Sequence, residues 1–165
     1  MSERIGIYPG SFDPIHNGHL DLISRSRSLF DRMYIAVLHN EEKRPLFSVD
    51  ERVAMIREVV ADYPDCEVAS FSGLLVDFVR QVNGQTIVKG LRAVSDFEFE
   101  FQMALMNRRL HPQVETVFMV PREDLTYVSS RLIKEVCKLG GRPDGLMPAS
   151  ICAQLKERLQ QQEAL

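Results

Sequence analysis

The sequence has few cysteines and lacks the spacing typical of a disulfide-rich protein. Its three cysteines, Cys66, Cys137 and Cys152, are odd in number and lie far apart in a chain of 165 residues. Such a count and spacing favour neither a disulfide framework nor a zinc knuckle. Free thiols are typical of a reducing compartment, so we expect a cytoplasmic protein.

Long apolar runs and an excess of positive charge are also absent. No stretch approaches the length of a membrane-spanning helix, and the first residues lead into an apolar run without the pattern of a secretory signal. The chain has 20 Lys and Arg against 23 Asp and Glu, which gives a formal net charge of -3. A nonspecific nucleic-acid binder needs a basic surface, so neither nucleic acid nor a membrane is an expected partner.

Three common active-site motifs are missing. The sequence contains no Gly-x-Gly-x-x-Gly fingerprint, no Gly-x-x-x-x-Gly-Lys-Ser/Thr loop and no Gly-x-Ser-x-Gly elbow. Their absence argues against a nicotinamide-dependent enzyme, a P-loop kinase and an α/β-type hydrolase.

What the sequence does contain is a regular alternation of short apolar runs and amphipathic segments. Buried parallel strands are typically continuous apolar runs, whereas helices repeat their apolar residues every three or four positions. Such alternation predicts right-handed βαβ units, and therefore one α/β domain over 1–165 with an open, doubly wound, five-stranded parallel sheet and helices on both faces. The expected strands are 4–9, 33–38, 67–71, 86–89 and 116–120, and the expected helices are 18–30, 49–61, 73–82, 95–110, 129–138 and 151–159.

Four polar clusters are expected to meet at the carboxyl edge of this sheet. Three of them directly follow the first, second and fourth strands, and the last opens the helix after the fifth strand. Ligands of open α/β sheets bind at this edge, where the strand order reverses. The clusters are Ser11 with 16–19, then 41–45, 89–92 and 128–131.

The first cluster suits a phosphate. Unpaired N–H groups at a helix N-terminus point toward an anion, and His19 would add a further donor there. Gly18 would allow the backbone to approach a ligand closely. His16 and His19 could instead hold a metal, but no cysteine or third histidine lies nearby in the sequence, so phosphate contact is favoured.

The other clusters each have a structural alternative. The charged turn around Lys43 is an ordinary solvated turn unless its position beside the first cluster makes Lys43 a cation of the site. Lys89 and Arg92 flank a glycine turn, and because surface cations contribute little to stability, phosphate binding is favoured. Ser129 is expected to cap its helix, to bind a phosphate, or to do both.

These motifs together resemble a known enzyme family. Two segments are similar to the two signatures of the nucleotidylyltransferase superfamily, and further segments are similar to those of phosphopantetheine adenylyltransferases. The resemblance implies a Rossmann-like nucleotidylyltransferase fold and transfer of the adenylyl group of ATP to 4′-phosphopantetheine, which gives dephospho-coenzyme A and pyrophosphate. The superfamily segments are 16–19 and 128–131, and the family segments are 8–14, 89–92, 96–100 and 106–107.

The resemblance also implies roles for the matched residues. The catalytic set would be His19, Lys43 and Arg92, with His19 donating to the α-phosphate. ATP would be contacted by Ser11, Phe12, His19, Gly90, Arg92, Glu100, Val128, Ser129, Ser130 and Arg131. Phosphopantetheine would be contacted by Ser11, Lys43, Leu75, Lys89, Met106 and Asn107, with Leu74 in the same wall.

The family likeness further implies Mg²⁺ as cofactor, a homohexamer and coenzyme A as a feedback ligand. Two positions depart from the common family pattern: Lys89 stands where many members have Arg, and Arg131 where Ser is frequent. The motifs contain no apparent protein base or covalent nucleophile. The substrate's own phosphate is therefore expected to attack, with the enzyme positioning it and neutralising charge.

Two other functions remain open from the sequence. Another adenylyl- or cytidylyltransferase, acting on nicotinate mononucleotide or glycerol phosphate, would share the first and last clusters, although 89–92 and 96–100 favour phosphopantetheine. A noncatalytic nucleotide-binding module, for example a coenzyme A sensor, would keep the cations but could dispense with His19.

Overall fold

Five parallel strands form the centre of the molecule. The computed structural model describes residues 3–39, 44–92 and 97–163, and its sheet has the order β3-β2-β1-β4-β5 with every pairing parallel. Each expected strand is confirmed, with its ends displaced by one residue at most. The strands are β1 (Ile5–Gly10), β2 (Arg32–Leu38), β3 (Cys66–Phe71), β4 (Thr86–Gly90) and β5 (Glu115–Met119).

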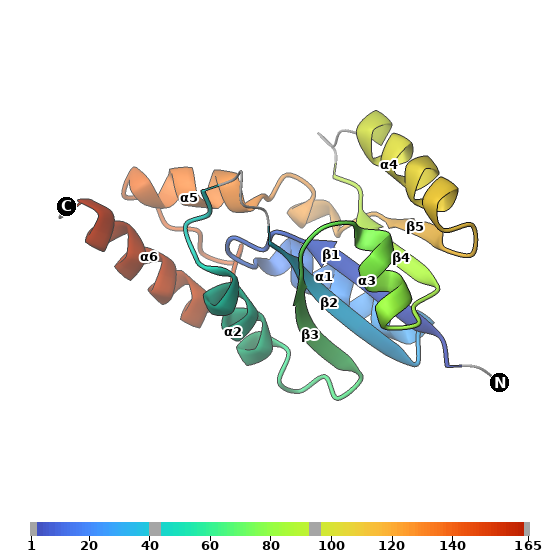
Figure 1. Cartoon of the computed structure of the whole chain (residues 1–165). Helices are drawn as coiled ribbons and strands as arrows, with labels where there is room; N and C mark the ends of the chain where they lie inside the picture. Colours follow the sequence, from blue (N-terminus) through green and yellow to red (C-terminus); the bar gives the residue numbers. More distant parts are fainter. Residues whose placement is uncertain (1–2, 40–43, 93–96, 164–165) are drawn as a thin grey trace.

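Helices cover both faces of this sheet, as predicted; in Figure 1, α3 lies in front of the strands and α1 behind them. The first helix is shorter than expected, because its last turn tightens into a 3-10 helix over Arg27–Leu29. None of the described helices is long and apolar enough to cross a membrane. The helices are α1 (Asn17–Ser26), α2 (Val49–Val59), α3 (Leu75–Gln81), α4 (Phe97–Leu110), α5 (Ser130–Lys138) and α6 (Ala149–Glu163), with a second 3-10 turn at Glu123–Leu125.

Alternating strand side chains build an apolar core on each face. Ile7 of β1 packs with Val79 of α3 in one cluster, whereas the neighbouring Tyr8 packs with Leu22 of α1 and Ile56 of α2 in the other. This alternation follows from the two-residue period of a strand. Burial on both faces explains why the central strands are nearly continuous apolar runs in the sequence.

The strand order reverses beside β1. The chain adds β2 and β3 on one side of β1 and then returns to its other side with β4 and β5. The loops that leave β1 and β4 therefore open next to each other, which is where open α/β sheets bind ligands.

Candidate active site

The loop after β1 forms the floor of the site. Phe12 has a φ of +48°, a left-handed conformation that is unusual for a bulky residue, and only 2% of it is exposed. Its ring meets Tyr8 edge-on at 5.5 Å and His19 at 4.9 Å between centroids. Because this side chain is buried beneath His19, a contact between Phe12 and ATP would have to come from its backbone.

His16 and His19 cap α1 reciprocally. The N–H of Gly18 donates to His16 Nδ1, and the N–H of His16 donates to His19 Nδ1, both at 3.1 Å. Their rings stack with centroids 3.6 Å apart. Since each Nδ1 is an acceptor, each neutral ring carries its proton on Nε2. The role of His16 was missed from the sequence, although the three-residue spacing is that of a capping box.

Both rings are held neutral. Burial, reinforced by Arg92, lowers the pKa of His16 to about 3. Burial, His16 and Arg92 together hold the pKa of His19 well below its ordinary value. His19 stays partly exposed while His16 is buried. At neutral pH, His19 is therefore an uncharged donor whose remaining polar group is Nε2–H.

The expectation of free N–H donors at the start of α1 is wrong. Asn17 N–H donates to Leu146 O at 2.8 Å, Gly18 N–H donates to the His16 ring, and the next two N–H groups donate to His16 O. Gly18 leaves room for the His16 ring, since an added Cβ would lie 3.0 Å from it. The donor that this helix start offers to an anion is therefore the His19 side chain.

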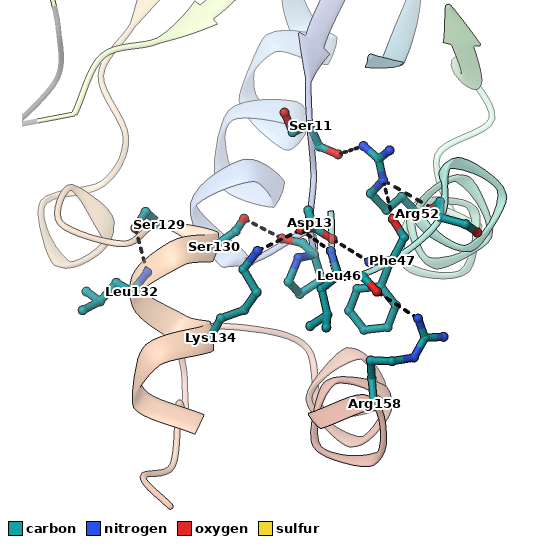
Figure 2. A network of polar contacts seen from close by, with 12 residues as sticks. Ser11, Asp13, Leu46, Phe47, Arg52, Ser129, Ser130, Leu132, Lys134 and Arg158 are labelled. Atoms are coloured by element: carbon teal, nitrogen blue, oxygen red, sulfur yellow. Dashed lines mark hydrogen bonds and ion pairs between the residues drawn. The ribbon is translucent and has the colours of Figure 1, made fainter. Parts of the chain in front are cut away.

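The start of α5 is different. Ser129 caps this helix by accepting the N–H of Leu132 at 3.1 Å, which confirms the cap interpretation. Ser130 Oγ donates to Pro14 O at 2.7 Å and so joins the helix to the loop after β1 (Figure 2). Within the described residues, the N–H groups of Ser130 and Arg131 meet no acceptor. This helix start therefore presents two N–H donors to an anion.

Arg92 lies on the β4 side of the site. It follows β4 and its Nη1 donates to Val128 O at 3.4 Å, close to the start of α5. The positive charge of Arg92 contributes to lowering the pKa of both His16 and His19. Gly90, the last residue of β4, allows α1 to approach, because an added Cβ would lie 2.4 Å from Leu22 Cδ1. Three of the four predicted clusters therefore meet at one sheet edge.

Sequence comparisons agree with this arrangement. Residues 7–136 match the cytidylyltransferase-like family model. Phosphopantetheine adenylyltransferases of Clostridium perfringens and of Anaeromyxobacter sp. (strain K) are 53% and 51% identical over 156 residues, which is 94% of this chain and 95% of each relative. The chain belongs to the phosphopantetheine adenylyltransferase family.

A solved structure shares the fold of this adenylyltransferase family member at low identity. The crystal structure of a lipopolysaccharide core biosynthesis protein from Thermoplasma volcanium superposes with a TM-score of 0.57 at 22% identity. The match covers 74% of the chain described here and 100% of the Thermoplasma volcanium protein. At such identity the likeness concerns the fold.

Most of the residues expected on the phosphopantetheine side lie on β4, α3 and α4. Lys89 Nζ lies 3.3 Å from Glu100 Oε2, so two predicted ligand contacts pair with each other, although the geometry of this pair does not make a hydrogen bond. Leu75 opens α3, which α4 contacts. On α4, Met106 is exposed and Asn107 is buried. Leu74, expected in the same wall, is exposed.

Two predicted site residues remain, Lys43 and Arg131, and the structure does not place either side chain at the site. Lys43, predicted to be catalytic, lies outside the described residues. Arg131 reaches away toward Glu135, with its Nε 3.2 Å from the carboxylate and 88% of its side chain exposed. Only its backbone N–H therefore faces the site, because the side chain is held along α5.

The described side chains do not form a cage for a divalent cation. No group of three or more His, Cys, Asp or Glu within 3–39, 44–92 and 97–163 has a suitable arrangement. Near the crevice, the carboxylate of Asp13 already accepts the N–H groups of Leu46 and Phe47 and the ammonium of Lys134. Glu100 is paired with Lys89.

Proposed function

We propose that this chain carries out the reaction of its family, adenylyl transfer from ATP to 4′-phosphopantetheine. An oxygen of the substrate phosphate forms a bond to the α-phosphorus of ATP, and the bond from that phosphorus to the pyrophosphate oxygen breaks. The products are dephospho-coenzyme A and pyrophosphate. The attacking phosphate is already anionic at neutral pH, so the reaction needs no protein base and no covalent intermediate.

The hydrogen-bonded state of His19 is the observation that carries this proposal. Because Nδ1 accepts a backbone N–H, the neutral ring directs an Nε2–H donor at the anion. A fixed donor of this kind stabilises the charge that develops on the α-phosphate, and its loss typically lowers kcat by about 100- to 1,000-fold. The relatives at about 50% identity favour phosphopantetheine as the acceptor.

The other residues supply charge and contacts around this donor. We assign Arg92 and Lys43 as the catalytic cations, Lys43 on the family resemblance alone. The Ser129 hydroxyl and the N–H groups of Ser130 and Arg131 would bind the triphosphate, as anions are bound at helix starts. The remaining ATP contacts are Ser11, Phe12, Gly90, Glu100, Val128, Ser129, Ser130 and Arg131, and the phosphopantetheine contacts are Ser11, Leu75, Lys89, Met106 and Asn107.

A divalent cation is implied by the class of reaction, and we propose Mg²⁺. This ion prefers substrate phosphates with few protein carboxylates. Since the carboxylates of Asp13 and Glu100 are already engaged, Mg²⁺ would enter as part of the ATP complex. The residues of this chain would then bind and orient that complex.

We further propose that the single domain assembles as a homohexamer, which coenzyme A regulates by feedback. The face of α4 supports an assembly, because it leaves several large apolar side chains about half exposed, as contact surfaces do. The free thiols of the three cysteines support a cytoplasmic location. The exposed apolar residues of α4 are Phe97, Phe99, Phe101, Met103, Leu105, Met106 and Leu110.

Pyrophosphate release from ATP with a panel of acceptors tests the proposal. We expect release with 4′-phosphopantetheine, and none with dephosphorylated pantetheine, nicotinate mononucleotide or glycerol phosphate. Turnover with either of the last two would reassign the acceptor. Binding of ATP by calorimetry with no turnover on any acceptor would instead support a noncatalytic module.

A further inference from the structure

Asp13 is nearly buried in the loop after β1, and the proposed chemistry does not use it. It is 7% exposed. Its Oδ1 accepts the N–H of Phe47 at 2.9 Å, and its Oδ2 accepts the N–H of Leu46 at 2.9 Å and Lys134 Nζ at 2.8 Å (Figure 2). A carboxylate that already accepts from three donors has few lone pairs left for a metal. It is well suited to holding these donors in place.

The donors come from two sides of the crevice. Leu46 and Phe47 immediately precede α2, whereas Lys134 lies on α5, one turn beyond Ser130. Ser130 itself donates to the carbonyl of Pro14, the neighbour of Asp13. The first half of α5 is therefore tied to the loop after β1 at two adjacent residues. That loop leads to His19, while α5 presents the N–H donors, so these ties set the separation of two phosphate-binding groups.

Arg52 braces the same loop from the side of β2. This residue is 2% exposed, and its guanidinium donates to Ser11 O at 2.6 Å, Phe47 O at 3.1 Å and Leu38 O at 3.3 Å. A fourth acceptor is Ser48 O at 3.3 Å, and all four are backbone carbonyls of the loop after β1 and of the two ends of the connection between β2 and α2. The segment at Leu46 and Phe47, which hydrogen-bonds to Asp13, is therefore also fixed by Arg52.

We propose that Asp13, with Lys134, is a positioning residue for adenylyl transfer. The pair aligns the start of α5 with His19, so that both act on the same nucleotide. This inference rests on the proposed function. Alignment matters most in the transition state, where a displacement of about 1 Å costs roughly a hundredfold in rate. Loss of the pair should therefore lower kcat far more than it raises KM.

The test is steady-state kinetics of Lys134→Met in the full-length protein. We expect kcat to fall about tenfold to a hundredfold, while KM for ATP and for 4′-phosphopantetheine changes less than about threefold. Lys134→Arg, which keeps a cation at this position, should recover most of the rate. If Lys134→Met does not fold, Lys134→Gln is measured for the same split between kcat and KM.

Arg27→Met is the matched control. Arg27 Nη2 pairs with Asp65 Oδ1 at 2.5 Å, and the side chains are 26% and 25% exposed, against 25% for Lys134 and 10% for Asp13. Asp65 precedes β3, at the opposite edge of the sheet. Arg27→Met should lower the free energy of unfolding without lowering kcat. An equal fall in kcat in both variants would overturn the proposal, as would a kcat within twofold of the unaltered protein in folded Lys134→Met.

Hydrogen exchange tests the positioning role of Asp13 and Lys134 independently of the proposed adenylyl transfer. The amides of Leu46 and Phe47 should exchange faster in Lys134→Met than in Arg27→Met. That pattern in a protein that shows no turnover would contradict the proposed function but support the brace. Turnover together with unchanged exchange of both amides in Lys134→Met would retain the function and overturn the positioning role.

Discussion

At the scale of single residues, the chemistry of the crevice depends on which nitrogen of His19 carries the proton. A backbone N–H occupies Nδ1, and burial with a neighbouring cation keeps the ring neutral. The side chain therefore has an Nε2–H group with which it can donate. Its partner His16 is equally neutral, but its burial at the helix cap gives it a structural role.

His19→Ala should lower kcat by about 100- to 1,000-fold, because it removes a donor that acts on developing charge. ATP should still bind in calorimetry, since Arg92 and the start of α5 remain. His111→Ala is the control, because this histidine follows α4, at the edge of the sheet away from the crevice. A kcat close to that of the unaltered protein in His19→Ala would remove His19 from the mechanism.

The buried histidines also predict how stability depends on pH. The pKa of His16 is about 3 in the folded chain and about 6.5 when unfolded, so between these values only the unfolded chain takes up the proton. Stability is therefore complete above pH 6.5 and falls below it, by about 1.4 kcal/mol per pH unit for this residue. His19 contributes in the same direction.

His16→Asn should reduce this slope while keeping a cap, since Asn is a good N-cap residue that does not titrate. The measurement is urea unfolding at several pH values between 7.5 and 5, above the range in which carboxylates protonate. An unchanged slope in the variant would mean that His16 is not the group responsible.

At the scale of elements, the apolar residues of α6 are spaced so that they form one buried face of the helix. Its apolar residues recur in the sequence at intervals of four, and Ile151, Leu155 and Leu159 are all buried in the core beneath it. At the start of α2, the Ser-x-x-Glu pattern of Ser48 and Glu51 is typical of a capping box, and both of its hydrogen bonds are formed. Local patterns were sufficient for both helices, because each depends on neighbours within one turn or on a single buried stripe.

Leu155→Ala should lower the free energy of unfolding by about 2–5 kcal/mol, because it leaves a cavity in a site with no exposure. Turnover should persist below the unfolding temperature, since α6 contributes no residue to the crevice. The comparison is Leu139→Ala at a position 89% exposed, which should change stability by less than about 0.5 kcal/mol. Equal losses in urea unfolding would show that α6 is not part of the core.

At the scale of the whole molecule, α4 is the feature that the core does not explain. From the sequence alone the roles of Phe97, Phe99 and Phe101 are open, and core packing is expected for at least some of them; in the structure all three are about half exposed. Their alternation puts them around the helix rather than on one buried stripe. A contact with another copy of the chain would cover them.

Phe99→Glu should weaken the proposed hexamer. Sedimentation of the unaltered protein should give about six times the mass of one chain, and the variant should give smaller species, because a charge would be buried in the contact. Leu139→Glu is the control, since Leu139 is exposed at the end of α5. A monomeric unaltered protein contradicts the hexamer, whereas a variant that stays hexameric places the contact elsewhere.

Much of this molecule follows from local pattern, and the rest follows from distant contacts. The strands, the sheet edge and the residue types in the crevice were all predictable, since buried parallel strands and βαβ order leave a direct trace in the chain. The occupied N–H groups of α1 were not, because Asn17 finds its acceptor at Leu146. Nor were the ties from Asp13 to Lys134 and from Arg52 to Ser11.

The sequence by itself determined the elements, their order and the family, because these depend on residue periodicity and on motifs that are contiguous in the chain. Only the tertiary structure decided which groups are free to act. Whether an N–H, a carboxylate or an imidazole is available depends on its hydrogen-bond partner and its burial. The partners of the Asn17 N–H and of the Asp13 carboxylate come from segments more than 30 residues away in the sequence, as with Asp13 and Leu46.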